Sequence, residues 1–251
     1  MAIHLNGKTA VVTGASGQLG RVMARTLARC GADVAVHYVK NKAMAESVAA
    51  EIAEMGQRAI AVSADITNES DVNQMRDIIR DKLGHVDIVV NNAVIQYEWK
   101  RILEQDLADF SSQFDSCTMQ SVLTAKSFLP AMIEKKAGRF IGINTECSAL
   151  CNANSGAYAA AKRGMDGLYR VLAKEVGPSG ITVNQISPGW TISERDRENA
   201  TENAPNTSGT IALGRRGTDQ EIANVVLFLA SDLSSFVTGV NIPVCGGTFM
   251  V

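Results

Sequence analysis

The sequence predicts an α/β fold, with helices on both faces of a parallel sheet, in one domain that spans residues 1–251. Three observations lead to this prediction. The 251 residues, 46% of them hydrophobic, are enough to form one sizeable core. Short apolar runs alternate with helical patterns almost to the end of the chain. A glycine-rich turn joins the first apolar run to the first helical pattern.

Seven short runs are predicted as buried strands because they are rich in valine and isoleucine and are bounded by turn residues. They span residues 9–12, 33–38, 58–63, 87–91, 139–144, 182–187 and 240–244. The first helix carries Leu19, Val22, Met23 and Leu27 at helical spacing and is predicted to end at Gly31. Further helices are predicted over residues 42–55, 69–83, 107–135, 157–176 and 219–230.

One irregular stretch follows the sixth strand, over residues 193–212, and is polar with few apolar residues. Ligands of open α/β sheets bind beyond the carboxyl ends of the strands, so this stretch is a candidate lid over a substrate. A solvated surface loop is an equally good interpretation of the same residues.

The charge balance argues against nucleic acid and membrane surfaces as partners, since the chain has 24 Lys and Arg and 26 Asp and Glu. The N-terminus lacks a signal-peptide pattern and no apolar run is long enough to span a membrane, which favours a cytoplasmic protein. The five cysteines have no metal-ligand spacing, so we expect reduced thiols and no metal site.

The turn "TGASGQLG" has the form of a phosphate cradle. It follows a strand and opens a helix, which directs free backbone N–H groups and the positive helix end at a pyrophosphate. Gln18 stands where a second close-approach glycine belongs. Its amide could bond a phosphate oxygen, so we expect binding to be retained. The alternative is a tight turn that only packs the helix on the strand.

Tyr158 and Lys162 are four residues apart on a predicted helix and therefore share a face. A nearby ammonium favours the phenolate and brings a tyrosine toward useful acidity, so the pair can give a proton to a carbonyl oxygen. An amphipathic helix with a snorkelling lysine would show the same spacing.

Taken together, these motifs resemble those of the short-chain dehydrogenases/reductases, a family that includes β-ketoacyl carrier-protein reductases and sugar and polyol dehydrogenases. The resemblance runs from "TGASGQLG" through "ADIT", "NNAV", "YAAAK" and "NQISPGW" to "TGVNIPVCGG". It implies a single Rossmann-type domain with seven parallel strands, an NAD(H) or NADP(H) cofactor, and a homotetramer or homodimer.

The resemblance also assigns catalytic roles. Tyr158 becomes the proton donor, and Lys162 binds the nicotinamide ribose and lowers the tyrosine pKa. The substrate-orienting serine of the family falls on Thr145, with Ser148 as a neighbouring alternative. The family asparagine that kinks a helix and holds a relay water falls on Cys117, whose thiol cannot replace an amide's paired hydrogen bonds.

Cofactor contacts are implied at the turns that follow the strands. Val94 and Cys245 depart from the family glycine and aspartate, and Trp190 is expected to form a pocket wall. The implied cofactor-binding residues are Gly14, Ser16, Gly17, Gln18, Leu19, Gly20, Asp65, Ile66, Asn92, Ala93, Val94, Tyr158, Lys162, Pro188, Gly189 and Thr191.

The end of the second strand favours NADP(H) over NAD(H), although NAD(H) is also compatible. NAD-binding sites place an acid there to accept the ribose hydroxyls, whereas this chain has Tyr38 with Lys40 nearby. A 2′-phosphate would meet no repulsion and could pair with Lys40. The basic residue that many NADP-binding turns carry is absent, because position 17 is glycine.

Two functions follow from the sequence. The first is an oxidoreductase that acts on a small carbonyl or alcohol substrate, with Tyr158 as acid and base. The second is a cofactor-binding sensor or scaffold that has lost catalysis, suggested by the departures at Gln18, Val94, Thr145 and Cys117. Subunit contacts or core packing equally explain the apolar residues Leu123, Phe128, Met132, Leu168 and Leu172.

Overall fold

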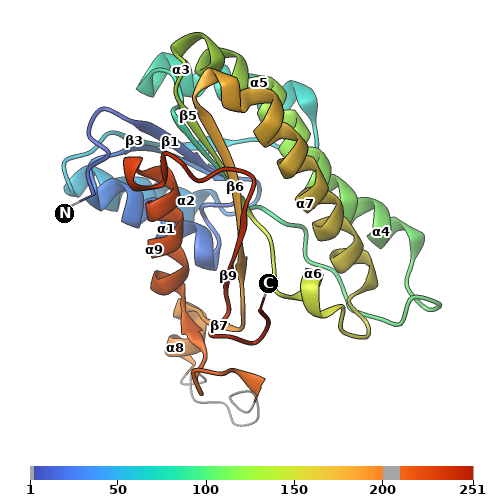
Figure 1. Ribbon diagram of the computed structural model, residues 1–251. Helices are drawn as coiled ribbons and strands as arrows, with labels where there is room; N and C mark the ends of the chain where they lie inside the picture. Colours follow the sequence, from blue (N-terminus) through green and yellow to red (C-terminus); the bar gives the residue numbers. More distant parts are fainter. Residues whose placement is uncertain (1–2, 200–209, 251) are drawn as a thin grey trace.

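The computed structural model describes residues 3–199 and 210–250 and contains one seven-stranded parallel sheet (Figure 1). The strand order is β3-β2-β1-β4-β5-β6-β9. The strands are β1 (Thr9–Val12), β2 (Asp33–Tyr38), β3 (Ala59–Ser63), β4 (Ile88–Asn91), β5 (Gly138–Ile143), β6 (Ile181–Pro188) and β9 (Asn241–Val244). The predicted single-domain Rossmann-type fold is confirmed, and the predicted strands agree with these bounds to within two residues.

The order of the strands reverses between β1 and β4, which are neighbours in the sheet but not in the chain. In β1, Val11 pairs with Ala35 of β2 on one side and with Val89 of β4 on the other. The chain leaves β1 and β4 in opposite directions across the sheet, the arrangement that in open α/β sheets forms a crevice beyond the carboxyl ends. Open α/β sheets bind ligands at such a switch point.

Helices cover both faces of the sheet, as Figure 1 shows for α1 and α9 on one side and α5 and α7 on the other. One core lies under α1 (Gln18–Arg29), α2 (Lys42–Glu54) and α9 (Asp219–Ala230). The second core lies under α3 (Glu69–Leu83), α5 (Gln120–Lys135) and α7 (Gly156–Val176). Strand residues alternate between these cores, with Val12 in the first and Val11 in the second.

The second core contains two of the apolar residues for which the sequence allowed either a subunit contact or core packing. Phe128 and Met132 are buried in it, while Leu123 and Leu172 pack against its edge and are half-buried.

The helix predicted over residues 107–135 is interrupted, so the prediction of one continuous helix is wrong. It is divided into α4 (Leu107–Phe114), a π-helical turn (Asp115–Met119) and α5. No glycine or proline marks the turn in the sequence. Tertiary contacts hold it instead, since the Thr118 hydroxyl donates to the carbonyl of Ala161 in α7 at 2.7 Å and the Gln120 amide reaches Ala93 O at 2.6 Å. The turn contains Cys117, where the family resemblance expected a kink.

Several short elements were not predicted. They are α6 (Cys147–Leu150), the paired strands β7 (Thr191–Ile192) and β8 (Gly217–Thr218), α8 (Glu194–Glu198), and two 3₁₀ turns, Gly177–Ser179 and Asp232–Ser234. The stretch expected to be irregular, residues 193–212, therefore begins with a helix. Residues 200–209 of that candidate lid lie outside the described residues. No helix in the described part of the chain is long and apolar enough to cross a membrane.

Candidate active site

The segments that the sequence singled out meet at the carboxyl edge of the sheet. The glycine-rich turn follows β1, Lys40 follows β2, and Asp65 and Ile66 follow β3. Asn92, Ala93 and Val94 follow β4, while Thr145 follows β5 and Pro188 ends β6. Tyr158 and Lys162 reach the same edge from the first turns of α7. Parallel strands bring residues that are far apart in sequence into one crevice.

The glycine-rich turn packs its backbone against the turn that follows β4. Gly14 has a φ of +64°, and a Cβ at this position would lie 3.0 Å from the Cα of Ala93. A Cβ on Gly20 would overlap the carbonyl oxygen of Gly14. Both positions therefore need glycine. Gly17 is the N-cap of α1 and provides no side-chain cap, which leaves the first amides of the helix available to an anion.

Thr13 connects the two turns. Its hydroxyl oxygen accepts from the backbone N–H groups of Asn92 at 2.9 Å and Ala93 at 3.0 Å. The side-chain amide of Asn92 donates in return to the carbonyl of Thr13 at 2.9 Å. The two sides of the crevice are thus held at a fixed spacing.

His37 is a functional residue that the sequence reasoning did not assign to the site. Its side chain is fully buried at the end of β2. Gly14 N–H donates to Nδ1 at 2.8 Å, so Nε2 carries the proton and donates to Ala64 O at 2.9 Å. Burial lowers the pKa of His37, which maintains the neutral imidazole that both hydrogen bonds require. The run of three apolar residues that precedes His37 in β2 gives no sign of this role.

The carboxamide oxygen of Gln18 is hydrogen-bonded within the protein. That oxygen accepts from the Arg21 guanidinium at 3.0 Å and from the backbone N–H of Arg195 in α8 at 3.1 Å. The residue that replaces the usual glycine therefore connects the candidate phosphate turn to the segment after β6. Nothing in the sequence around Gln18 indicates this contact, which joins residues 177 positions apart.

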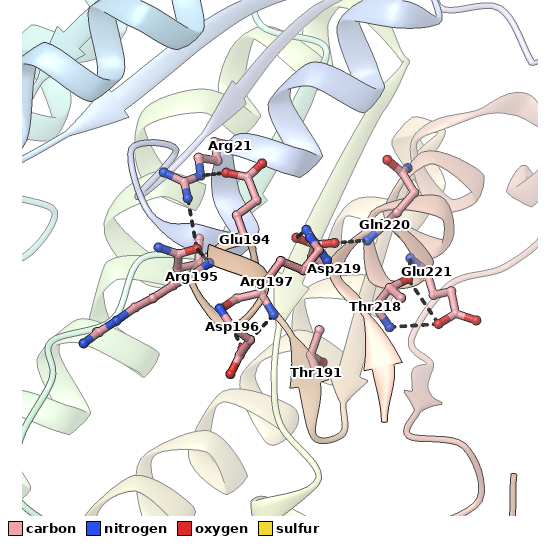
Figure 2. A network of polar contacts seen from close by, with 12 residues as sticks. Arg21, Thr191, Glu194, Arg195, Asp196, Arg197, Thr218, Asp219, Gln220 and Glu221 are labelled. Atoms are coloured by element: carbon pink, nitrogen blue, oxygen red, sulfur yellow. Dashed lines mark hydrogen bonds and ion pairs between the residues drawn. The ribbon is translucent and has the colours of Figure 1, made fainter. Parts of the chain in front are cut away.

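An ion-pair network extends this connection (Figure 2). Glu194 of α8 pairs with Arg21 at 2.5 Å and with Arg25 at 2.6 Å, both on α1. Arg25 also pairs with Glu51 of α2 at 2.7 Å. At the other end of α8, Arg197 pairs with Asp219, the first residue of α9, at 2.6 Å. The start of the predicted lid is thus attached directly to α1 and α9, and through Arg25 to α2.

A capping box stabilises the start of α8. Ser193 and Asp196 form a capping box, in which the Ser193 side chain accepts from the Asp196 backbone and the Asp196 carboxylate accepts from the Ser193 backbone. The Ser193 backbone N–H and hydroxyl both donate to the Asp196 carboxylate and lower its pKa to about 2.

Tyr158, Thr145 and Lys162 come together beyond β5. The Thr145 hydroxyl acts on the Tyr158 phenol in the direction that lowers its pKa. The Nζ of Lys162 lies 5.7 Å from the centre of the Tyr158 ring and donates to Ile143 O at 2.5 Å. Ser148, the alternative hydroxyl, instead donates to the backbone carbonyl of Thr145 at 2.9 Å. The geometry therefore favours Thr145 as the hydroxyl facing the tyrosine.

The pKa of Tyr158 is shifted in the opposite direction to the one expected from the sequence. Burial raises the pKa of Tyr158 well above its usual value, and the nearby Cys117 and Cys147 thiols add to the increase. Burial also lowers the pKa of Lys162, because the ammonium is completely enclosed. Desolvation thus outweighs the expected effect of the ammonium on the phenol in this structure.

Cys117 is fully buried in the π-helical turn. Burial raises the pKa of its thiol, and the positive charge of Lys162 offsets this only partly. A protonated, enclosed thiol is a poor nucleophile and a weak hydrogen-bond partner. Cys117 therefore fills the space of the expected relay residue without its amide chemistry.

The turns after β3 and β6 are also fixed by local bonds. Asp65 accepts from the backbone and hydroxyl of Thr67, at 2.9 and 2.7 Å, and these bonds lower its pKa. After β6, the Thr191 hydroxyl donates to Gly189 O at 2.9 Å. Trp190 is half exposed and lies against the Arg216 guanidinium at 5.3 Å, and its role as a pocket wall stays a prediction.

Comparisons with known proteins agree with this architecture. A family model described as enoyl-(acyl carrier protein) reductase matches residues 14–248. A 3-oxoacyl-[acyl-carrier-protein] reductase from Synechocystis is 34% identical over 247 residues, which cover 98% of each chain. A protein of the same name from Escherichia coli K12 is 35% identical over 260 residues, covering 99% of this chain and 100% of the relative.

Solved structures are similar over the whole chain as well. The crystal structure of a putative gluconate dehydrogenase from Agrobacterium tumefaciens superposes with a TM-score of 0.92 at 30% identity and covers 100% of this chain and 99% of its own. A short-chain type dehydrogenase/reductase from Mycobacterium marinum gives a TM-score of 0.90 at 31% identity, with 100% and 98% covered.

Proposed function

Because the chain belongs to the short-chain dehydrogenase/reductase family and is an oxidoreductase, we propose that it transfers a hydride between NADP(H) and a carbonyl or secondary alcohol. The observation that carries this proposal is the convergence of Tyr158, Thr145 and Lys162 beyond β5, beside the glycine-rich turn. The alternative of a scaffold without catalysis is not favoured, since no observation explains why such a protein would keep this group.

The residues of the crevice fit a dinucleotide. The uncapped N-terminus of α1 offers amides to a pyrophosphate. Gly14 and Gly20 allow the turn to pack closely on itself and on the turn that follows β4. Tyr38 and Lys40 would receive the adenosine ribose, and Lys40 favours a 2′-phosphate because no acid stands at this strand end. Lys162 would bond the nicotinamide ribose, and Pro188, Gly189 and Thr191 would lie along the nicotinamide ring.

The proton in this proposal moves through Tyr158. When bound, the nicotinamide supplies or accepts the hydride. Thr145 orients the substrate oxygen, and the Tyr158 phenol donates a proton to that oxygen in reduction or accepts it in oxidation. The phenol is in its protonated form at neutral pH, which is the form that donates in reduction.

Replacing Tyr158 by phenylalanine tests the proposal. We expect Tyr158→Phe to reduce turnover of any active carbonyl substrate by at least about a hundredfold, the usual contribution of a positioned acid, with NADPH affinity unchanged. Tyr169→Phe on the same helix is the matched control, because Tyr169 is buried in the second core and bonds Asn91. Unchanged turnover in Tyr158→Phe would refute the assigned role.

A further inference from the structure

A small cavity lies beside Tyr158, under the chain that follows β4. Its volume is about 130 Å³, and Tyr158, Tyr97, Trp99, Ile95 and Gln113 are among its lining residues. None of the described residues that line it is charged. A cavity of about 150 Å³ accommodates one benzene ring, so this space suits a single six-membered ring.

Aromatic side chains form one wall of this cavity. The ring centres of Tyr97 and Trp99 are 6.5 Å apart, and those of Trp99 and Tyr158 are 6.0 Å apart. The Tyr97 hydroxyl accepts from the backbone N–H of Tyr158 at 3.0 Å. This bond fixes Tyr97 relative to the proton donor, so the wall and the reacting phenol have a constant spacing.

Gln113 supplies a polar group that the protein does not use. Its side chain is completely buried, and its Nε2 donates to Ile95 O at 2.8 Å. Because a carbonyl can only accept, this bond determines which end of the amide faces Ile95. The other end, Oε1, is buried and has no hydrogen-bond partner among the described residues. A buried acceptor without a donor is unfavourable, and a ligand that supplies the donor recovers that loss.

We propose, on the basis of the proposed function, that the substrate is an uncharged cyclic ketone or alcohol whose ring occupies this cavity and whose second substituent, a hydroxyl or N–H group, donates to Gln113 Oε1. The reacting oxygen then faces Tyr158 and Thr145. None of the described residues that line the cavity supplies a cation to a carboxylate, so an uncharged ring is favoured over a sugar acid at this position.

Calorimetric titration with two ring compounds tests the proposal without requiring turnover. We expect cis-cyclohexane-1,3-diol to bind the wild-type protein about tenfold more tightly than cyclohexanol, the gain of one hydrogen bond to a buried acceptor. In Gln113→Met this gain should fall below twofold while cyclohexanol affinity changes little. Gln220→Met, on α9 across the sheet, is the control and should keep the tenfold gain.

A second variant addresses the ring itself. Trp99 is nearly half exposed, so Trp99→Ala is expected to fold, and it should weaken both ring compounds several-fold. Cyclohexanecarboxylate should bind at least tenfold more weakly than cyclohexanol. Equal binding of the diol and cyclohexanol to wild type, or an undiminished gain in Gln113→Met, would overturn the proposal.

The two proposals fail in different ways. Binding of the rings without reduction of 3-hydroxycyclohexanone by NADPH or NADH would contradict the proposed function and leave the cavity assignment in place. Reduction of open-chain ketones without ring binding would contradict the cavity assignment and support the proposed function.

Discussion

His37 holds two neighbouring turns of the crevice with one imidazole ring. Gly14 N–H and Ala64 O are its partners, and they belong to the turns that follow β1 and β3. The backbone carbonyl of the same residue accepts from Ala15 N–H at 2.9 Å. Two consecutive amides of the glycine-rich turn are therefore positioned by a residue at the end of β2, before any cofactor contact is made.

Replacing His37 by leucine should destabilise the protein and weaken NADPH binding. Both partners of the imidazole would be left buried and unpaired, which costs about 2–4 kcal/mol of the free energy of unfolding. Urea denaturation gives the stability, and fluorescence titration gives the NADPH affinity. A variant as stable as wild type would show that the two hydrogen bonds contribute nothing.

His37 should also make stability depend on pH. Its pKa is lowered in the folded protein, whereas the unfolded chain titrates near 6.5. The unfolded state therefore binds the proton first, and the contribution is complete above about pH 6.5 and is lost as the pH falls below it. The free energy of unfolding should decrease by up to about 1.4 kcal/mol per pH unit.

Denaturation at pH 7.5 and 5.5 measures this dependence. His37→Leu should reduce the slope, while His85→Gln, at an exposed position, should retain it. An equal slope in all three proteins would assign the pH dependence to other groups.

At single positions, the sequence predicted residues whose chemistry is local and missed those whose role depends on a distant partner. The four-residue spacing of Tyr158 and Lys162 was visible directly and placed both at the site. The function of His37 depends on its tautomer and on partners in other segments. The oxygen of Gln113 matters only because Ile95 occupies the nitrogen of the same amide. Neither condition leaves a sequence pattern.

Among the elements, α8 is the one whose position depends most on charge. It has five residues and none of them is buried. Its contacts with the domain include the Glu194 ion pairs, the pairs of Arg197 with Asp219 and of Asp196 with Arg216, and the bond from Arg195 N–H to Gln18. An element held this way opens locally with little apolar surface to expose.

Glu194→Gln should therefore loosen α8 without unfolding the domain. Arg21 and Arg25 would lose their carboxylate, and Arg21 is almost completely buried. We expect the amides of residues 195–199 to exchange with deuterium about fivefold faster, the factor for ~1 kcal/mol of local stability. Exchange in β1 and β4 should be unchanged. Glu198→Gln, at an exposed position of the same helix, is the control.

Element boundaries were predictable where periodicity and capping agree. The helix expected over residues 219–230 is observed with those bounds, and Thr218 and Glu221 form its capping box. The π-helical turn at residues 115–119 was missed because bonds from Thr118 to α7 and from Gln120 to Ala93 determine it, and no local residue does. The start of α8 was missed although Ser193 and Asp196 form a capping box there, because a helix of five residues with none buried shows no apolar periodicity.

For the whole molecule, the order of the strands explains why the sequence predicts the place of the site but not the arrangement of its side chains. Alternating strands and helices imply a parallel sheet, and the reversal between β1 and β4 concentrates the loops of both halves at one crevice. The sequence therefore predicts the edge of the sheet at which ligands bind. It does not specify the shape of the cavity there, because side chains from three segments together define it.

Binding of the proposed cofactor should stabilise the whole domain, and NADPH should do so more than NADH. A ligand that binds only the folded state at a hundred times its Kd adds about 2.7 kcal/mol. In a protein of this size that raises the Tm by about 5–10 °C. At equal concentrations, NADH should give a smaller increase, because only NADPH carries the 2′-phosphate that Lys40 can pair with.

Thermal unfolding of wild type and Lys40→Glu with each dinucleotide measures the preference. The variant places an acid at the end of β2, which should repel the 2′-phosphate and favour the free ribose hydroxyls. The order of the two Tm increases should then reverse, while the Tm without ligand stays the same because Lys40 is exposed. A larger increase with NADH in wild type would contradict the assignment of NADP(H), and no increase with either would contradict the dinucleotide site itself.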